Sequence, residues 1–151
     1  MHLKHDILYL KTTLFEPLEM NHTFPDQTEI IVPNRANPYE REGNILKNPQ
    51  QIDQSWKYAG GGMLSNAPDL IKFGNWVLKN YHEKNHPWLK KDANHRWLIG
   101  FDPRNGGHTG ASIGGSCILA INKEKSLLSV ILTNQTSSHT GILSTGISIS
   151  H

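Results

Sequence analysis

Apolar residues recur at helical spacing in one long stretch of the sequence. Asn66 stands where a helix N-cap is expected, with Pro68 in the first turn and Asp69 at the third helical position. The apolar positions that follow lie three or four residues apart and share one helix face: Leu70, Phe73, Gly74, Val77, Leu78 and Tyr81. The pattern predicts an amphipathic helix that packs on a core and ends by Pro87.

A weaker helical pattern lies near the N-terminus, between His5 and Phe15. Its apolar residues mark one rough face: Ile7, Leu8, Leu10, Leu14 and Phe15. Pro17 disfavours helical geometry at the residue before it, so this helix is expected to stop at about Glu16. A compact turn over Phe15–Met20 should follow.

Three short stretches in the second half of the chain favour strands. They are Trp97–Phe101, Ser112–Ile121 and Leu127–Thr133, separated by the polar turn segments Asp102–Gly106 and Asn122–Lys125. Short turns join antiparallel neighbours. The pattern therefore predicts a three-stranded antiparallel meander with helices packed on it, which is an α+β fold.

The segment from Thr23 to Gln54 has no sustained period. Prolines and amide residues interrupt it repeatedly, which predicts a long irregular excursion with one short strand at Ile30–Val32. A loop of this length inside a domain generally covers or borders a site. The chain is expected to consist of one domain over residues 1–134 and a low-order tail, rich in Ser, Thr and Gly, over residues 135–151.

Composition narrows the class of protein. With 151 residues, 19% charged residues and a net charge of +2, the chain has the make-up of one folded domain. Basic residues gather mildly at Lys84, Lys90, Lys91 and Arg96, without the density or aromatic interleaving of a nucleic-acid surface. We therefore expect a solvated face there and no nucleic-acid partner.

Neither a membrane span nor a targeting segment is expected from the sequence. No apolar run approaches the length of a membrane span. Charged and polar residues interrupt the first fourteen positions, unlike a signal peptide, and the arginine-rich character of a transit peptide is absent. The single cysteine, Cys117, excludes an internal disulfide, and its apolar neighbours predict a buried, inert thiol.

Glycines flank a polar triplet, His108-Thr109-Gly110, where the chain enters the middle predicted strand. Glycine suits a backbone that comes close to a ligand, but the same pattern is typical of a glycine-rich turn entering an edge strand. The run Gly60–Gly62 presents a similar choice. It can expose backbone N–H groups near a ligand or form a tight crossing beneath another element.

Two further histidine patterns carry less weight. His82–His86 matches the HExxH zinc pattern, but Pro87 disfavours helical geometry at His86 and no third ligand is evident, so no metal site is expected. A second His-Thr-Gly, at His139–Gly141, has no strand pattern after it and is interpreted as coincidence.

Four segments taken in order resemble the serine β-lactamase-like family, which is related to class C β-lactamases and penicillin-binding proteins. They are Phe15–Met20 (FEPLEM), Ala59–Leu64 (AGGGML), Ser65–Leu78 (SNAPDLIKFGNWVL) and His108–Ser116 (HTGASIGGS). The run that ends at Asn134 (LLSVILTN) closes the pattern. The resemblance spans about Leu14 to Asn134 and is closest to the mitochondrial branch of the family in animals, which shares FEPLEM with Glu19 where most relatives have glycine.

The resemblance implies a serine hydrolase that acts on peptide or amide bonds through an acyl-enzyme and uses no cofactor. Its nucleophile is the serine of Ser-x-x-Lys, assisted by Tyr-x-Asn. The third motif, Lys/His-Thr-Gly on a strand beside the site, corresponds to His108, Thr109 and Gly110. By resemblance, His108 and Thr109 help to hold the substrate and its carboxylate, and the backbone N–H of Ala111 is one oxyanion donor.

The sequence departs from the family at the decisive point, because it contains neither Ser-x-x-Lys nor Tyr-x-Asn. In the family these motifs precede the FEPL segment. The chain is therefore expected to be the C-terminal part of a β-lactamase/transpeptidase-like fold, inactive by itself and without a catalytic residue of its own.

Two functions stay open at this point. The first is a fragment of a serine hydrolase that binds a peptide or amide substrate once its N-terminal part completes the site. The second is a truncated, non-catalytic paralogue that acts as an interaction or self-assembly module, with self-association as the expected partnership. A mitochondrial location follows from the resemblance alone.

Overall fold

The computed structural model describes the chain apart from residues 1, 51–52, 54–59, 82–85, 97 and 137–151. Its helices are α1 (His2–Leu10), which continues as a π-helical turn (Lys11–Phe15), and α2 (Ala67–Asn80). Its strands are β1 (Phe24–Pro25), β2 (Tyr39–Glu42), β3 (Ile45–Lys47), β4 (Met63–Leu64), β5 (Asn105–Ser112), β6 (Gly115–Asn122), β7 (Leu127–Thr133) and β8 (Gln135–Thr136). The mixture of helices with an antiparallel sheet confirms the predicted α+β class.

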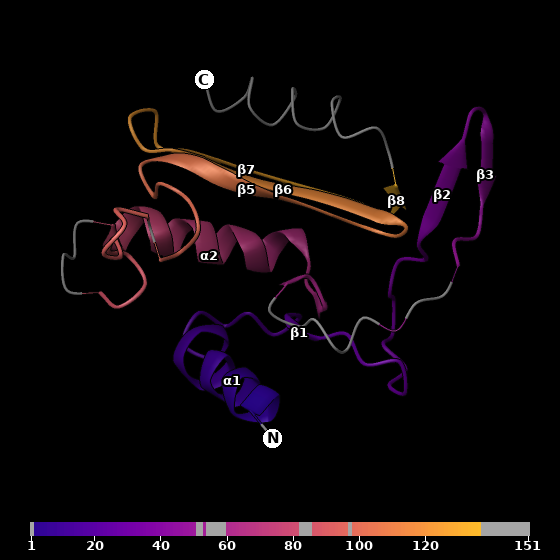
Figure 1. Cartoon of the computed structure of the whole chain (residues 1–151), viewed down its shortest axis with the longest axis horizontal. Coiled ribbons are helices and arrows are strands. Elements are labelled where there is room, and N and C mark those ends of the chain that lie inside the picture. Colours follow the sequence, from indigo (N-terminus) through magenta and orange to yellow (C-terminus); the bar gives the residue numbers. More distant parts are fainter. Residues whose placement is uncertain (1, 51–52, 54–59, 82–85, 97, 137–151) are drawn as a thin grey trace.

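The centre of the molecule is α2 packed on one face of the β5–β6–β7 meander (Figure 1). Asn66 caps α2 as predicted, since its side-chain oxygen accepts the backbone N–H of Asp69 at 2.9 Å. Val77 on the helix and Ile121 on β6 are fully buried together with Leu89. The apolar stripe predicted for α2 is thus the face that contacts the sheet. The helix ends at Asn80, several residues before Pro87.

The meander is confirmed, but its first strand lies elsewhere than predicted. Residues 98–101 form a turn, in which Ile99 and Phe101 pack against the core around Val77. These side chains are therefore apolar because they pack on the core, although their backbone forms a turn and pairs with no strand among the described residues. The first strand is β5, whose weak, glycine-rich sequence is held extended by eight residue pairs with β6.

The predicted strand Ser112–Ile121 is divided by a tight turn. Gly114 adopts a φ of +75°, a left-handed conformation that glycine favours, and it separates β5 from β6. The turn also packs closely, because a Cβ on Gly114 would lie 2.2 Å from Cβ of Pro38. The third predicted strand is confirmed at its predicted bounds as β7, and a turn over residues 123–126 precedes it.

The excursion, defined here as residues 21–50, is more ordered than predicted and has its strands in other places. The predicted strand Ile30–Val32 is wrong: Ile31 is 93% exposed, and Pro33 and Asn34 turn the chain directly after it. Instead, β2 and β3 form an antiparallel hairpin that projects beyond the end of the meander (Figure 1). Asp26 and Arg35 close the loop before this hairpin with two hydrogen bonds of 2.6 and 2.8 Å.

Distant segments hold the base of the hairpin. Strand β8, from the first two residues of the predicted tail, pairs in parallel with β2. The backbone N–H of Tyr39 donates to the carbonyl of Asn134 at 2.8 Å, and the Asn134 side chain donates to the carbonyl of Asn37 at 2.9 Å. Polar contacts, and not an apolar core, therefore attach the hairpin.

At the N-terminal side, the helix predicted for His5–Phe15 is confirmed and ends at Glu16 as expected. Its last turn is a π-helix, in which Glu16 N–H donates to the carbonyl of Lys11. The compact turn after it places Glu19 at a φ of +54°, and Lys72 of α2 donates to the Glu19 carbonyl at 2.5 Å. No helix among the described residues is long and apolar enough to cross a membrane.

A buried carboxylate fastens this region to α2. Asp69 is 1% exposed, and its Oδ2 accepts the backbone N–H of His22 at 2.8 Å and the hydroxyl of Thr23 at 2.9 Å. The Thr23 hydroxyl also contacts that of Ser65 at 2.9 Å. A buried charge is stable only when it is hydrogen-bonded in this way. Asp69 therefore fixes the start of α2 against the chain that leaves the FEPLEM turn.

Candidate functional site

The predicted site residues lie on β5, which is an edge strand of the described meander. His108, Thr109 and Ala111 are exposed, and Gly110 is half-buried. The triplet is therefore inside a strand and at its edge, not at the start of the middle strand as predicted. A row of exposed residues on an unpaired edge is open to an extended ligand.

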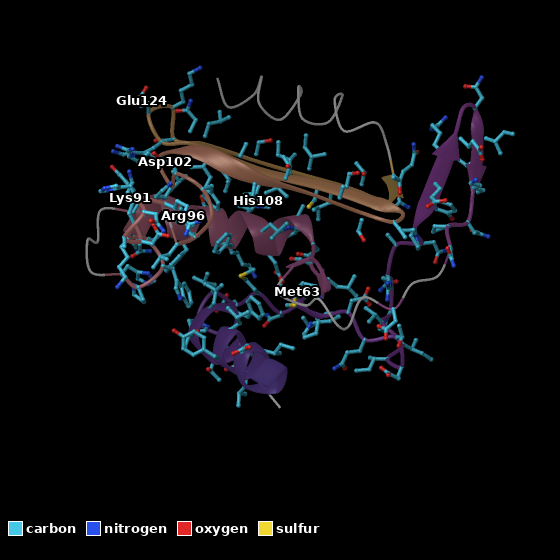
Figure 2. All side chains as sticks on the ribbon, in the orientation of Figure 1. Met63, Lys91, Arg96, Asp102, His108 and Glu124 are labelled. Atoms are coloured by element: carbon cyan, nitrogen blue, oxygen red, sulfur yellow. The ribbon has the colours of Figure 1, made fainter. Side chains whose placement is uncertain are left out.

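The strand register assigns the side chains to two faces. His108 pairs with Leu119 and Gly110 with Cys117, and these residues share the face of Ile121, which packs on α2. Thr109, one residue along, belongs to the other face. Figure 2 shows His108 on the side of the meander that faces α2.

The backbone of β5 directs one N–H group away from the sheet. The N–H of Gly110 approaches the thiol of Cys117 on β6, so it points toward that neighbouring strand. Successive N–H groups of a strand point to opposite sides. The N–H of Ala111 therefore points away from β6, to the edge of β5 that has no partner among the described strands, as does that of Thr109.

Cys117 is exposed, which corrects the prediction of a buried thiol. The strand opposite explains the difference: Gly110 has no Cβ to cover the sulfur, and a Cβ there would lie 2.8 Å from Sγ. Neighbouring atoms still remove part of the solvent from the thiol, and this burial raises its pKa, while the Gly110 N–H lowers it to a smaller extent. Cys117 is therefore a weak nucleophile at neutral pH.

The glycines before the triplet are needed for packing within this chain. A Cβ on Gly107 would lie 2.0 Å from the carbonyl oxygen of Leu119, and one on Gly106 would lie 2.6 Å from that of Asp102. The backbone of β5 thus lies close to β6 at Gly107 and to the preceding turn at Gly106. Of the two readings left open for these glycines, the structure favours the edge strand.

In the second glycine run, Gly62 is buried, while Gly60 and Gly61 lie in open space with respect to the described residues. Among the described residues, nothing lies within 4 Å of a Cβ built on Gly60 or Gly61, and Gly61 has a φ of +135°. Gly62 accepts the N–H of Asp26 at 2.8 Å and leads into β4, which pairs with β1. The run therefore supplies backbone freedom for the entry to β4 and α2.

The other histidine patterns yield no site in the described part of the chain. His139–Gly141 and four residues of the HExxH match, His82 to Asn85, lie outside it. His86 packs edge-to-face on Trp76 and Trp88, and its Nδ1 accepts the Trp88 N–H at 3.3 Å. No three His, Cys, Asp or Glu residues come together as metal ligands among the residues with described positions.

Comparison with known families adds to this geometry. The sequence model described as Beta-lactamase matches residues 8–144, which is most of the chain. The chain belongs to the beta-lactamase family. The family model spans α2, the meander and the triplet on β5, so the resemblance seen in the motifs is confirmed.

Curated relatives in the beta-lactamase family include the mitochondrial serine beta-lactamase-like protein LACTB of cattle and of humans. The chain is 37% identical to the protein of Bos taurus over 90 residues and 36% identical to that of Homo sapiens over 90 residues. These matches cover 58% of this chain, but only 15% and 16% of the two relatives. The matched residues of this chain thus correspond to less than a fifth of the length of each relative.

A solved structure shows the same fold. The D-stereospecific amidohydrolase from Streptomyces sp. superposes with a TM-score of 0.61 at 12% identity, over 93% of this chain and 47% of that chain. The likeness covers about half of the amidohydrolase. It supports the predicted β-lactamase-like fold for the described elements.

Sequence reasoning missed the surface position of Cys117 and the outward N–H of Thr109. Apolar neighbours predicted burial for the thiol, whereas the register pairs it with a glycine that leaves it uncovered. Gly110 in the sequence could have indicated an uncovered thiol, but its pairing with Cys117 became known only once the turn was placed at Gly114. A turn placed one residue away would have moved every pair.

Proposed function

We propose that β5 is the substrate-binding wall of a beta-lactamase-family serine hydrolase that acts on peptide or amide bonds. The observation that carries the proposal is the exposed row His108, Thr109 and Ala111 along an edge that no described strand pairs with, where the N–H of Ala111 is directed outward. An outward N–H in this position can donate to the oxygen of a tetrahedral intermediate.

Each residue of the row has a distinct part in this proposal. The outward N–H and C=O groups of Thr109 and Ala111 can bind an extended peptide as an added strand. The Thr109 hydroxyl and the His108 ring hold the substrate and its carboxylate. Gly110, on the same face as His108, has no side chain and so leaves space beside that ring.

Acyl-enzyme formation needs a nucleophile that these 151 residues lack as a Ser-x-x-Lys motif. Cys117 is no substitute, because burial raises its pKa and leaves little thiolate at neutral pH. We therefore infer that the chain binds substrate without cleaving it, and that cleavage requires a serine from sequence beyond these residues.

A fluorophosphonate probe tests the absence of a nucleophile. The chain is expected to remain unlabelled at every serine, as judged by intact mass, under conditions that label an authentic serine hydrolase. Covalent labelling of any serine in this chain would overturn this part of the proposal.

A titration by NMR tests the binding wall independently. An acetylated dipeptide with a free C-terminal carboxylate should shift the amide signals of Thr109 and Ala111 most strongly. Thr109→Val removes the hydroxyl at nearly constant volume and should weaken binding, while Thr28→Val, at an exposed loop position, should not. Shifts centred away from residues 108–111, or equal effects of both variants, would contradict the assignment.

The compartment is a further part of the proposal. The cattle and human relatives are mitochondrial by name, and we extend that location to this chain. Fractionation of cells that express the natural product, followed by immunodetection, should find it with mitochondrial markers. Recovery in the cytosolic fraction alone would contradict the assignment.

A further inference from the structure

The turn that ends β5 is two residues long and departs from the usual hairpin geometry. It connects Ser112 to Gly115 through Ile113 and Gly114. The favoured two-residue hairpin turns have a positive φ at the first central residue. Here only the second central residue, Gly114, has a positive φ, and Ile113 is β-branched, a type of side chain that rarely adopts one. Support for this turn is therefore expected from outside the hairpin.

Thr136 of β8 supplies that support. Its hydroxyl oxygen accepts the backbone N–H of Gly114 at 2.6 Å, and the hydroxyl donates to the carbonyl of Ser112 in a longer contact of 3.4 Å. Gly114 is buried, so its N–H would lose an acceptor that water replaces poorly if the hydroxyl were removed. Strand β2 holds Thr136 in turn, because Glu40 pairs with Thr136 in the parallel β2–β8 ladder.

We propose that Thr136 is a positioning residue for the β5 site. Ala111, whose outward N–H is the oxyanion donor of the proposed function, stands directly before Ser112. The direction of that N–H depends on register and twist at the end of β5, and both are set by the turn that Thr136 holds. Thr136 acts through the turn and does not contact the substrate. The proposal rests on the proposed function of β5, since a positioned donor matters only where a substrate binds.

Thr133 provides a matched control for the loss of a threonine hydroxyl. It is half-buried, as Thr136 is, and lies three residues before it in the chain. Its hydroxyl contacts the carbonyls of Ser116 at 3.3 Å and of Gln135 at 3.2 Å. Both acceptors lie outside the turn, so Thr133→Val removes a comparable hydroxyl and leaves the support of the turn in place.

NMR of the unliganded chain tests whether Thr136 holds the donor. Thr136→Val removes the hydroxyl at nearly constant volume, so it should speed hydrogen exchange at Gly114 and shift the amide signal of Ala111. Thr136→Ser keeps a hydroxyl and should restore both signals toward those of the unmodified chain. An Ala111 signal that stays in place in Thr136→Val, or that moves equally in the Val and Ser variants, would overturn the proposal.

A titration with the acetylated dipeptide that carries a free C-terminal carboxylate tests the consequence for binding. Thr136→Val should weaken binding about two- to tenfold, the range expected when one hydrogen bond to the ligand is lost or misdirected. Thr136→Ser and Thr133→Val should bind as the unmodified chain does. Equal weakening in Thr133→Val and Thr136→Val would show a general loss of stability and refute the positioning role.

The two arms separate this proposal from the proposed function. If the unmodified chain does not bind the dipeptide at residues 108–111, the proposed function fails, and the unliganded Ala111 signal still decides whether Thr136 holds that N–H. If the unmodified chain binds the dipeptide and Thr136→Val binds it equally well, the proposed function stands and the role of Thr136 is refuted.

Discussion

Two regions of this molecule are held together by different physics. The core region, α2 with β5–β7, is stabilised by apolar burial around Val77 and Ile121, which are 0% and 1% exposed. The excursion, residues 21–50, contributes no fully buried hydrophobic residue, and its hairpin carries Ile45 at 68% and Leu46 at 53% exposure. Hydrogen bonds to Asp69 and Asn134 hold it instead, together with close packing of Pro38 on Gly114.

This difference predicts how substitutions in the two regions should affect stability. Apolar burial is distributed over many contacts and fails with the whole domain, whereas a tether is a single interaction whose loss frees one segment. The largest effects are therefore expected from the core, smaller ones from the tethers, and the smallest from exposed ion pairs.

Ile121→Ala should have the largest effect. It removes a fully buried side chain at the contact between β6 and α2, and such truncations cost about 2–5 kcal/mol of unfolding free energy. Denaturation by urea, followed by circular dichroism, measures the change. The matched control is Ile45→Ala in the hairpin, which should cost less than about 1 kcal/mol. Similar losses in both variants would break the distinction between the two regions.

Asp69→Ala should follow, because it leaves the His22 N–H and the Thr23 hydroxyl without their acceptor in a part-buried site. We expect a loss of about 1–3 kcal/mol, measured in the same urea titration. Asp69→Asn keeps an acceptor oxygen and should recover part of that loss. If Asn were no better than Ala, packing and not hydrogen bonding would explain the role of Asp69.

Gly114→Ala should separate the hairpin from the meander. The φ of +75° strains any side chain at a cost of about 1–3 kcal/mol, and the new Cβ would collide with Pro38. Amide hydrogen exchange should accelerate at Tyr39–Glu42 more than in α2. Gly43→Ala is the control: it has a similar φ of +59° but no neighbour within 4 Å, so it should leave Tyr39 protected. Uniform acceleration across α2 would argue against a local tether.

The smallest expected effect is the pH response of the Glu42–Lys47 pair. The hydrogen bond from Lys47 lowers the pKa of Glu42, so the contribution of the pair is present above the unfolded carboxyl pKa and is lost as the pH falls through the folded one. The same bond raises the pKa of Lys47, so the contribution also disappears as the pH rises through that higher value.

Hydrogen exchange of β3, corrected for intrinsic rates, should therefore show slightly weaker protection at both pH extremes than at neutrality. Glu42→Gln should remove the acid limb and leave the protection of α2 unchanged. A pronounced loss of global stability in Glu42→Gln would show that the hairpin is part of the cooperative core.

The predictions made from sequence succeeded where local pattern and final packing agree. The spacing of apolar residues after Asn66 identified α2 and its buried face, and the short apolar run Leu127–Thr133 identified β7. Motifs in the same order indicated the family, which the match over residues 8–144 confirmed. These features depend on periods of a few residues, which a sequence displays directly.

Predictions failed where a partner from elsewhere decides the conformation. Residues 98–101 are apolar because they pack on Val77, yet they form a turn. Asn105–Ser112 has poor strand propensity and is nevertheless extended, because β6 supplies a complete ladder. Cys117 looked buried from its neighbours in sequence, while the residue across the ladder is a glycine.

The sequence by itself determined the helix caps, the apolar face of α2, the strand β7, the family and the absence of a Ser-x-x-Lys nucleophile. Only the tertiary structure decided that His108, Thr109 and Ala111 occupy an edge strand of the described meander, and that the N–H of Ala111 points away from β6. The reason is that the direction of a backbone group depends on strand register. Register is set by a turn such as that at Gly114 and by the partner strand, neither of which can be read from the residue itself.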